Sequence, residues 1–146
     1  MTPLVAVLLA GCGPTAPPRH YGFLALLGND TVSIENVTRT GNTLTSDEVD
    51  RFPRVRRRHT VIRLASNGSV RHLEMDIRTP SEPPAERLRH VVADVSKDEV
   101  RIVKTDSTGV VRITQATGGM LAMPQLEQMY SLTDLYFAAA FAGAPS

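Results

Sequence analysis

Apolar and polar residues alternate along most of the chain from His20 to Thr117, and turn-forming residues interrupt the alternation at short, regular intervals. A period of two places successive side chains on opposite faces of a β-strand. Regular turn signals between such segments are typical of an antiparallel meander, sandwich or barrel. The pattern therefore predicts about eight strands, at residues 20–27, 30–40, 43–52, 54–66, 69–79, 87–96, 99–106 and 110–117.

The turn at Lys97-Asp98 offers a test of this assignment. If the turn has two residues, Val95 lies opposite Val100, and Asp94 lies opposite Arg101 on the other face. Directly opposed residues on antiparallel strands favour apolar pairs and pairs of opposite charge. The register predicted by the turn meets both requirements, which supports the strand assignment.

The alternation stops after Gly118-Gly119, and residues 124–141 are rich in Leu, Met and Ala. Pro124 is suited to a first helical turn, and apolar residues recur there at steps of three and four. We therefore expect a C-terminal helix at 124–141 that packs on the apolar face of the sheet. The face expected to point inward consists of Leu126, Met129, Tyr130, Thr133, Tyr136, Phe137 and Ala140.

These elements predict a mainly β fold of the α+β kind, a curved open sheet or partial barrel with one helix, formed as a single domain by residues 20–146. The chain ends abruptly in small residues after the expected helix, which leaves open a truncated product with more of the domain beyond it. Apolar residues make up 42% and charged residues 21% of the 146 residues, as in a globular domain.

Composition excludes several classes of partner and site. Aromatic residues make up only 5% of the chain, without Trp, and the net charge is +1. Both features argue against a stacking surface or a basic track for nucleic acid. A single cysteine excludes an internal disulfide and a zinc site built from cysteines. The chain also lacks a nucleophile elbow, a phosphate-binding glycine-rich loop and a dinucleotide fingerprint, so we assign no catalytic residue and expect no cofactor.

The one cysteine lies directly after an apolar run that covers residues 4–11. Such a run is far shorter than the roughly 20 residues that span a bilayer, but it matches the apolar core of a secretory signal. The run ends in Leu9-Ala10-Gly11-Cys12, which resembles the lipobox of bacterial lipoproteins: an aliphatic residue, a small residue, Gly or Ala, then Cys.

The lipobox resemblance implies that residues 1–11 are a signal peptide and that the thiol of Cys12 carries the lipid. Acyl chains would then hold the protein at a membrane of the bacterial cell envelope, facing the periplasm or the exterior, because two or more chains give stable anchoring. The stretch at 12–19, with Pro14, Pro17 and Pro18, is predicted to be a tether between anchor and domain.

The turn signal Asn67-Gly68 predicts a hairpin that brings ionisable residues together on one face. In that register Asp76 lies opposite His59, while His72 and Glu74 share the same face. Imidazoles with carboxylates can hold a divalent metal ion or transfer protons, so these four residues are the candidates for a metal-binding or hydrolytic site. The alternative is a solvated face stabilised by cross-strand ion pairs.

A dense basic run at Arg54, Arg56, Arg57 and Arg58 also allows two interpretations. The arginines suit contacts with anionic headgroups near the anchor. They also suit an edge strand that charge protects against aggregation, and the second interpretation is the one we favour.

Together these features favour a non-enzymatic envelope lipoprotein that binds a hydrophobic ligand between sheet and helix, or an envelope protein. Its mature domain resembles uncharacterised all-β envelope lipoproteins and, in architecture only, the half-barrel of periplasmic lipoprotein carriers. One alternative is the metal-binding or hydrolytic site described above. Another is a structural accessory domain, or a fragment of a larger envelope protein.

Overall fold

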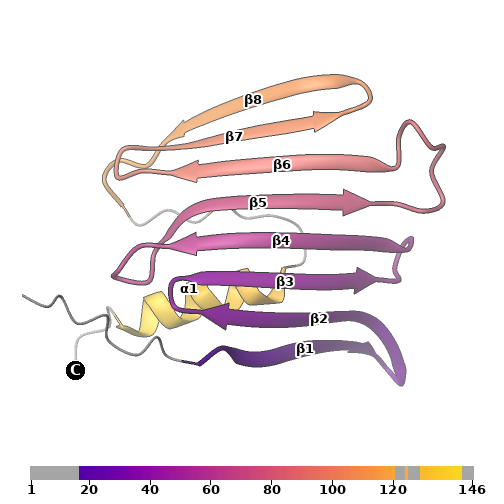
Figure 1. The fold of residues 1–146 in the computed structure, drawn as a ribbon, viewed down its shortest axis with the longest axis horizontal. Helices are drawn as coiled ribbons and strands as arrows, with labels where there is room; N and C mark the ends of the chain where they lie inside the picture. The colour runs from indigo at the N-terminus through magenta and orange to yellow at the C-terminus, as the bar shows by residue number, and fades with distance from the viewer. Residues whose placement is uncertain (1–16, 121–123, 125–128, 143–146) are drawn as a thin grey trace, which may run out of the picture.

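A computed structural model describes residues 17–120, 124 and 129–142, and within them it shows an open antiparallel sheet with one helix (Figure 1). The strands pair in chain order, so β1 and β8 form the edges of the sheet. The elements are β1 (Arg19–Leu27), β2 (Asp30–Thr40), β3 (Thr43–Asp50), β4 (Arg56–Leu64), β5 (Val70–Arg78), β6 (Leu88–Val95), β7 (Glu99–Asp106), β8 (Gly109–Ala116) and α1 (Tyr130–Ala142).

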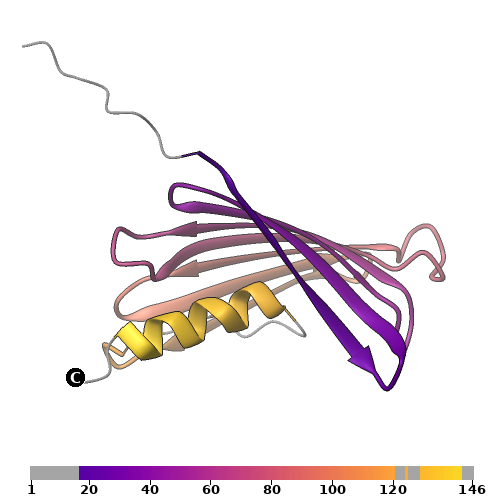
Figure 2. The same cartoon turned by 90° about the horizontal axis from the view of Figure 1, so that it is seen from below.

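The helix lies on one face of the sheet and runs along the strands on the β2 side (Figure 2). Its buried residues Leu132 and Leu135 join apolar side chains of the strands in a single core. Alternation along each strand sends these side chains to the helix-bearing face, here called the inner face. The buried apolar core consists of Val37, Leu44, Ile62, Leu64, Val70, Leu73, Met75, Val91, Ala93, Met129, Leu132 and Leu135.

The fold class predicted from the sequence is confirmed: the protein is mainly β, with eight antiparallel strands in one open sheet and a C-terminal helix among the described residues. The register expected at the Lys97-Asp98 turn is also confirmed, since Val95 pairs with Val100 and Asp94 with Arg101. The strands end within a few residues of the predicted bounds. Of the two shapes expected, the open sheet is the one observed.

The helix starts later than predicted and presents a different face to the sheet. Pro124 lies outside the helix, which begins at Tyr130, and residues 125–128 fall outside the described part of the chain. Of the residues expected to point inward, Met129 is buried just before the helix and Tyr130 is half-buried. Tyr136 and Phe137, however, are 58% and 53% exposed. Leu132 and Leu135 are buried in their place.

The cause of this rotation lies on β2. The carboxylate of Glu35 accepts hydrogen bonds from the backbone N–H of Ser131, at 3.0 Å, and from the Ser131 hydroxyl. A carboxylate at this position satisfies a free N–H of the first helical turn and interacts favourably with the helix dipole. Because Ser131 must face the sheet, the residues on its side of the helix are buried and the aromatic residues point outward.

The predicted signal peptide and lipobox, including Cys12, lie outside the described residues. Of the predicted tether, Pro17 and Pro18 are described and form no regular element, and β1 begins directly after them.

Candidate functional site

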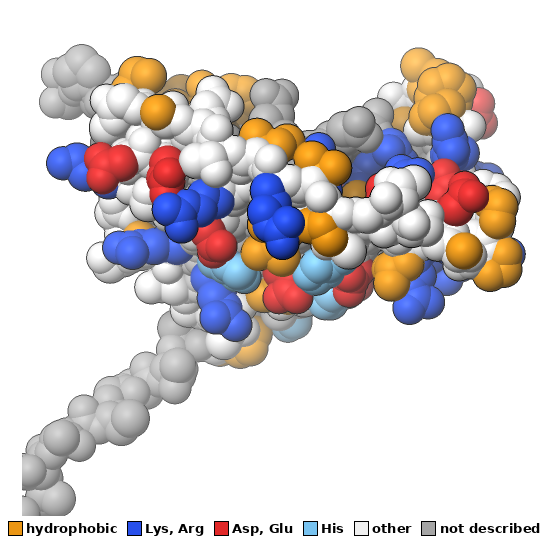
Figure 3. Space-filling view, turned by 90° about the horizontal axis from the view of Figure 1, so that it is seen from above, with side chains coloured by type: hydrophobic (Ala, Val, Ile, Leu, Met, Phe, Trp, Pro, Cys, Tyr) orange, Lys and Arg blue, Asp and Glu red, His pale blue; other side chains and the backbone are white. Residues whose placement is uncertain are grey.

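Histidines on the outer face of the sheet lie beside aspartates of neighbouring strands. His59 Nδ1 is 2.8 Å from Asp47 Oδ1 between β4 and β3, and His72 Nδ1 is 2.7 Å from Asp94 Oδ1 between β5 and β6. Figure 3 shows histidines next to acidic and basic side chains on one surface of the molecule. The face of the sheet that carries the four candidate residues therefore consists of exposed cross-strand pairs.

The four candidate residues do not converge. Asp76 is opposite His59 in the ladder, as predicted, but its carboxylate lies 2.8 Å from His90 Nδ1 on the other side, on β6. Glu74 lies 3.6 Å from Nε2 of the same ring. Sequence reasoning missed His90 because the proline-containing loop before β6 hides the register between β5 and β6.

Within the described ranges, no group of three or more His, Cys, Asp and Glu side chains is arranged to hold a metal ion. His59, His72 and His90 instead each have an aspartate partner on an adjacent strand, at the spacing of an ordinary cross-strand ion pair. Each of these partly exposed pairs contributes about 0.2–1 kcal/mol to the free energy of unfolding. The geometry thus favours the solvated face over the metal-binding interpretation.

The inner face of the same region buries charges beneath the start of the helix. Glu48 and Asp50 on β3 flank Arg58 on β4, and all three side chains are at most 2% exposed. Arg58 Nη1 donates to Glu48 Oε2 at 2.6 Å, and Nη2 donates to Asp50. Buried ions persist only when they are paired and hydrogen-bonded, and these contacts meet that condition.

Glu35 extends this cluster towards the helix. It lies directly opposite Glu48 in the ladder between β2 and β3. The Ser46 hydroxyl donates to Glu35 Oε1 at 2.5 Å, and the Ser33 hydroxyl donates to Glu48 Oε1 at 3.0 Å. With the two bonds from Ser131, the carboxylates connect three strands to the first turn of α1. We call Glu35, Glu48, Asp50 and Arg58 the buried cluster.

The protonation of Glu48 is strongly altered in this setting. Burial and, less strongly, the nearby Asp50 carboxylate raise the pKa of Glu48, while hydrogen bonds from Arg58 and Ser33 and the charge of Arg58 lower it, and the net pKa is about 7. Removal from water disfavours the charged form of a carboxylic acid, and a second carboxylate in the same site also disfavours it. Glu48 therefore changes its charge near neutral pH.

The buried cluster was not identified from the sequence, although a signal was present. Ser33, Glu35 and Val37 alternate on one face of β2, so the carboxylate is in phase with a core valine. A charged residue on the same face of a strand as buried residues indicates either a buried ion pair or a functional site. The side chains are closed to solvent, with Glu35 at 0% exposure, and the cluster serves to dock the helix rather than to receive a substrate.

The basic run does not protect an edge, so that interpretation is wrong. β4 pairs with β3 and β5 and lies in the interior of the sheet. Arg56 and Arg58 point inward, where Arg58 bonds the buried carboxylates and Arg56 lies 3.5 Å from Asp50. In the preceding loop, Arg54 forms a 2.9 Å ion pair with Glu82. Alternation places Arg57 on the outer face of β4, where it is exposed.

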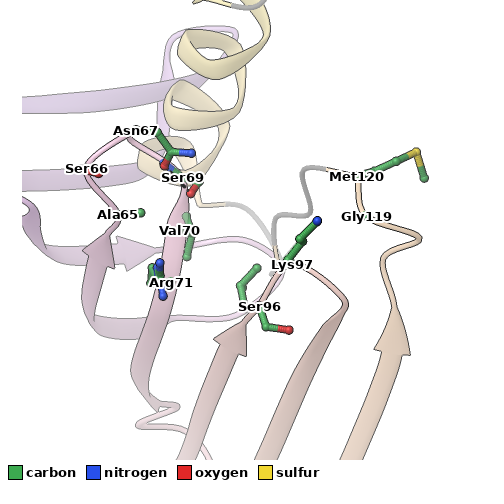
Figure 4. Close-up of a pocket in the computed structure, with 11 residues that line it drawn as sticks. Ala65, Ser66, Asn67, Ser69, Val70, Arg71, Ser96, Lys97, Gly119 and Met120 are labelled. Atoms are coloured by element: carbon green, nitrogen blue, oxygen red, sulfur yellow. Dashed lines mark hydrogen bonds between the residues drawn. The ribbon is translucent and has the colours of Figure 1, made fainter.

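A groove of about 600 Å³ opens at the end of the sheet where the β4–β5 and β6–β7 turns meet the segment after β8 (Figure 4). Its cations are Arg71 and Lys97, and Val70 and Met120 contribute apolar surface. The lining consists of Ala65, Ser66, Asn67, Ser69, Val70, Arg71, Val95, Ser96, Lys97, Gly119 and Met120.

The edge strand β8 is exposed along its whole length on both faces. Val110, Val111 and Ile113 are 48%, 57% and 42% exposed, and Arg112 is the one charged residue of the strand. Natural sheets usually protect such an edge with charges, proline, bulges or a covering segment. The charge on β8 is confined to a single side chain, so it offers an edge suited to pairing with another strand.

Searches against models of known protein families, curated proteins and solved structures returned no match. Among the described residues, no helix has the length and apolar character needed to cross a bilayer.

Proposed function

We propose that the protein is a lipid-anchored lipoprotein of the bacterial cell envelope whose β-domain binds a protein partner by adding a strand of that partner to β8. The exposed, apolar edge of β8 is the observation that carries this proposal. Strand addition supplies main-chain hydrogen bonds for affinity and side-chain pairs for specificity.

The side chains of β8 define the chemistry of the partner strand. Val111 and Ile113 share the inner face with Lys104 and Ile102 of β7, and Arg112 lies on the outer face opposite Val103. A complementary strand would place apolar residues beside Val111 and Ile113 and a carboxylate beside Arg112, because cross-strand pairs of these kinds are favourable. The proposed partner segment is therefore apolar and acidic in alternation.

The packing of the helix favours a protein partner over a ligand held between sheet and helix. Leu132 and Leu135 of α1 contact the apolar core directly, and the buried cluster fixes the first helical turn on the sheet. A hydrophobic ligand in that space would have to displace these residues. Strand addition at β8 leaves them in place.

The anchor is tested by mass analysis of the protein purified from membranes of a bacterial host. We expect a chain that begins at Cys12 and carries acyl chains, with the Cys12→Ser variant retaining residues 1–11 and lacking the lipid. A product that retains Met1 and a free thiol would refute the anchor, and this result would leave strand addition at β8 to be judged by its own test.

Strand addition is tested with a photo-crosslinking residue at Arg112 in cells that produce the full chain. We expect one discrete adduct, and we expect Val111→Lys to abolish it because a lysine in the pairing edge opposes strand addition. Leu24→Lys is the matched control, since Leu24 is 60% exposed on the opposite edge strand, and it should leave the adduct unchanged.

The identity of the adduct decides the outcome. A crosslinked segment of another protein with alternating apolar and acidic residues supports the proposal, and protection of β8 amides from hydrogen exchange by a peptide of that segment completes it. Three results would each overturn the proposal of strand addition. They are an adduct with a second copy of the chain, equal labelling from a probe at Arg63 on the outer face, and no adduct at all.

A further inference from the structure

The described residues that line the groove at the turn end of the sheet carry charge of one sign. Arg71 and Lys97 both line it, and none of the described lining residues carries a carboxylate. The side chains of these two cations form no ion pair within the described part of the chain. Two cations without a carboxylate partner in one concave site favour an anionic ligand.

Local backbone geometry places both cations at the groove. A register shift between Arg63 and Leu64 leaves Arg71 without a cross-strand partner on β4, because His72 pairs with Arg63 and Val70 with Leu64. An extra residue of this kind redirects a side chain away from regular alternation. Lys97 belongs to the β6–β7 turn, and Figure 4 shows its side chain extending into the space between the β4–β5 turn and Met120.

The β4–β5 turn adds an oriented neutral donor. The Asn67 side-chain oxygen accepts from the backbone N–H of Ser69 at 3.1 Å and from the Ser69 hydroxyl at 2.7 Å. These two bonds fix the amide plane, so the Asn67 amide nitrogen is left to donate. A guanidinium, an ammonium and an amide donor form a set suited to phosphate oxygens.

Apolar side chains complete the site. Val70, Val95 and Met120 line the groove next to the cations, and the volume of about 600 Å³ falls in the range of small-ligand sites. We propose that this groove binds a phosphate group, with Arg71 and Lys97 as its counter-charges and with the apolar residues contacting the part of the ligand that carries the phosphate. This inference is separate from strand addition at β8.

The shared chemistry has two sources, a phospholipid headgroup or a free phosphate compound, and the test separates them. Binding to the purified full chain is measured by calorimetry with inorganic phosphate and with a short-chain phosphatidylglycerol below its micellar concentration. Binding of both probes with similar affinity indicates a free phosphate compound, whereas binding of the lipid alone indicates a headgroup. Either result supports the site only if it depends on the two cations.

That dependence is measured in the double variant Arg71→Gln/Lys97→Gln. We expect its affinity for the binding probe to fall by about tenfold or more, because each charge-assisted hydrogen bond contributes more than a neutral one. The matched control is Arg63→Gln/Lys104→Gln, which removes one arginine and the other lysine outside the groove and should bind as the unaltered chain does. Circular dichroism of both variants confirms that they are folded.

If neither probe bound the unaltered chain, the proposal would be overturned. Equal losses in the two double variants would overturn it too, because the effect would then follow from net charge and not from the groove.

Discussion

The stability of the protein should decrease as the pH rises through neutrality, and Glu48 should be the main cause. Its pKa is about 7 in the folded protein and 4.5 in the absence of the fold. At pH values between these two, the folded protein holds a proton that the unfolded chain has released. The stabilisation is complete below the unfolded pKa and is lost as the pH rises through the folded pKa.

The structure gives both the size and the sign of the effect. Each pKa unit between the folded and unfolded states is worth about 1.4 kcal/mol. The rise from 4.5 to about 7 therefore corresponds to a loss of at most about 3.5 kcal/mol of unfolding free energy. The physical cause is that the ionised Glu48 is buried and lies near the Asp50 carboxylate, and Arg58 and Ser33 compensate only part of that cost.

The assay is urea unfolding followed by circular dichroism at a series of pH values from about 5 to about 8.5, the range in which the difference in bound protons should appear. Glu48→Gln keeps the shape of the side chain without a titrating proton and should remove most of the pH dependence. Glu74→Gln, on the exposed outer face, is the control, and it should retain most of the pH dependence of the unaltered chain.

A pH dependence that is identical in the unaltered chain and in Glu48→Gln would refute this reasoning. So would a stability that rises between pH 5 and pH 8 in the unaltered chain, because the sign of the linkage would then be reversed.

The remaining predictions concern the helix start and two glycines, and urea unfolding measures each of them. Ser131→Ala should lower the unfolding free energy by about 1 kcal/mol, because a hydrogen bond to Glu35 is lost; an unchanged value would show that the hydroxyl does not hold the helix. Gly22→Ala should cost about 1–3 kcal/mol, because a Cβ there would lie 2.8 Å from the Glu35 carbonyl oxygen; a neutral effect would show that β1 moves freely away from β2. Gly68→Ala should cost about 1 kcal/mol, because its φ of 83° is unfavourable for a residue with a side chain; no loss would argue against the hairpin turn.

The strands were predictable because each sequence segment carries its own information about faces and turns. The Asn67-Gly68 turn and the Lys97-Asp98 turn fixed the pairing of four strands without reference to the rest of the chain. A short turn leaves few possible registers, and alternation then decides which side chains share a face.

The outer-face site was less predictable because it depends on which of two neighbouring strands a side chain contacts. Asp76 has His59 on one side and His90 on the other, and the sequence alone showed only the first, whose turn is short. The loop before β6 is long, so the register between β5 and β6 could not be set in advance. The candidate set therefore included His59 and missed His90.

The orientation of the helix was the largest error, and it has a general physical cause. Apolar periodicity assigned the inner face to the aromatic residues, as if burial of apolar area were the sole determinant of rotation. Without Ser131, the buried Glu35 carboxylate would keep only the hydrogen bond from Ser46, and an incompletely hydrogen-bonded buried carboxylate costs more than the burial of one aromatic ring contributes. The alternation along β2 indicated that Glu35 is buried, because Glu35 lies on the same face of the strand as the core residue Val37.

The buried cluster thus determines which apolar side chains of α1 are buried and which remain exposed. With α1 held by Glu35, Leu132 and Leu135 complete the core, while Tyr136, Phe137 and Phe141 remain exposed. The rings of Tyr136 and Phe137 meet edge to face with centroids 6.1 Å apart, and those of Phe137 and Phe141 stack with centroids 6.4 Å apart. The charges cost stability compared with an apolar set of the same volume, yet they select one rotation of a helix that has apolar residues on more than one side. A polar contact with one allowed partner specifies that rotation, whereas apolar contacts alone would allow several.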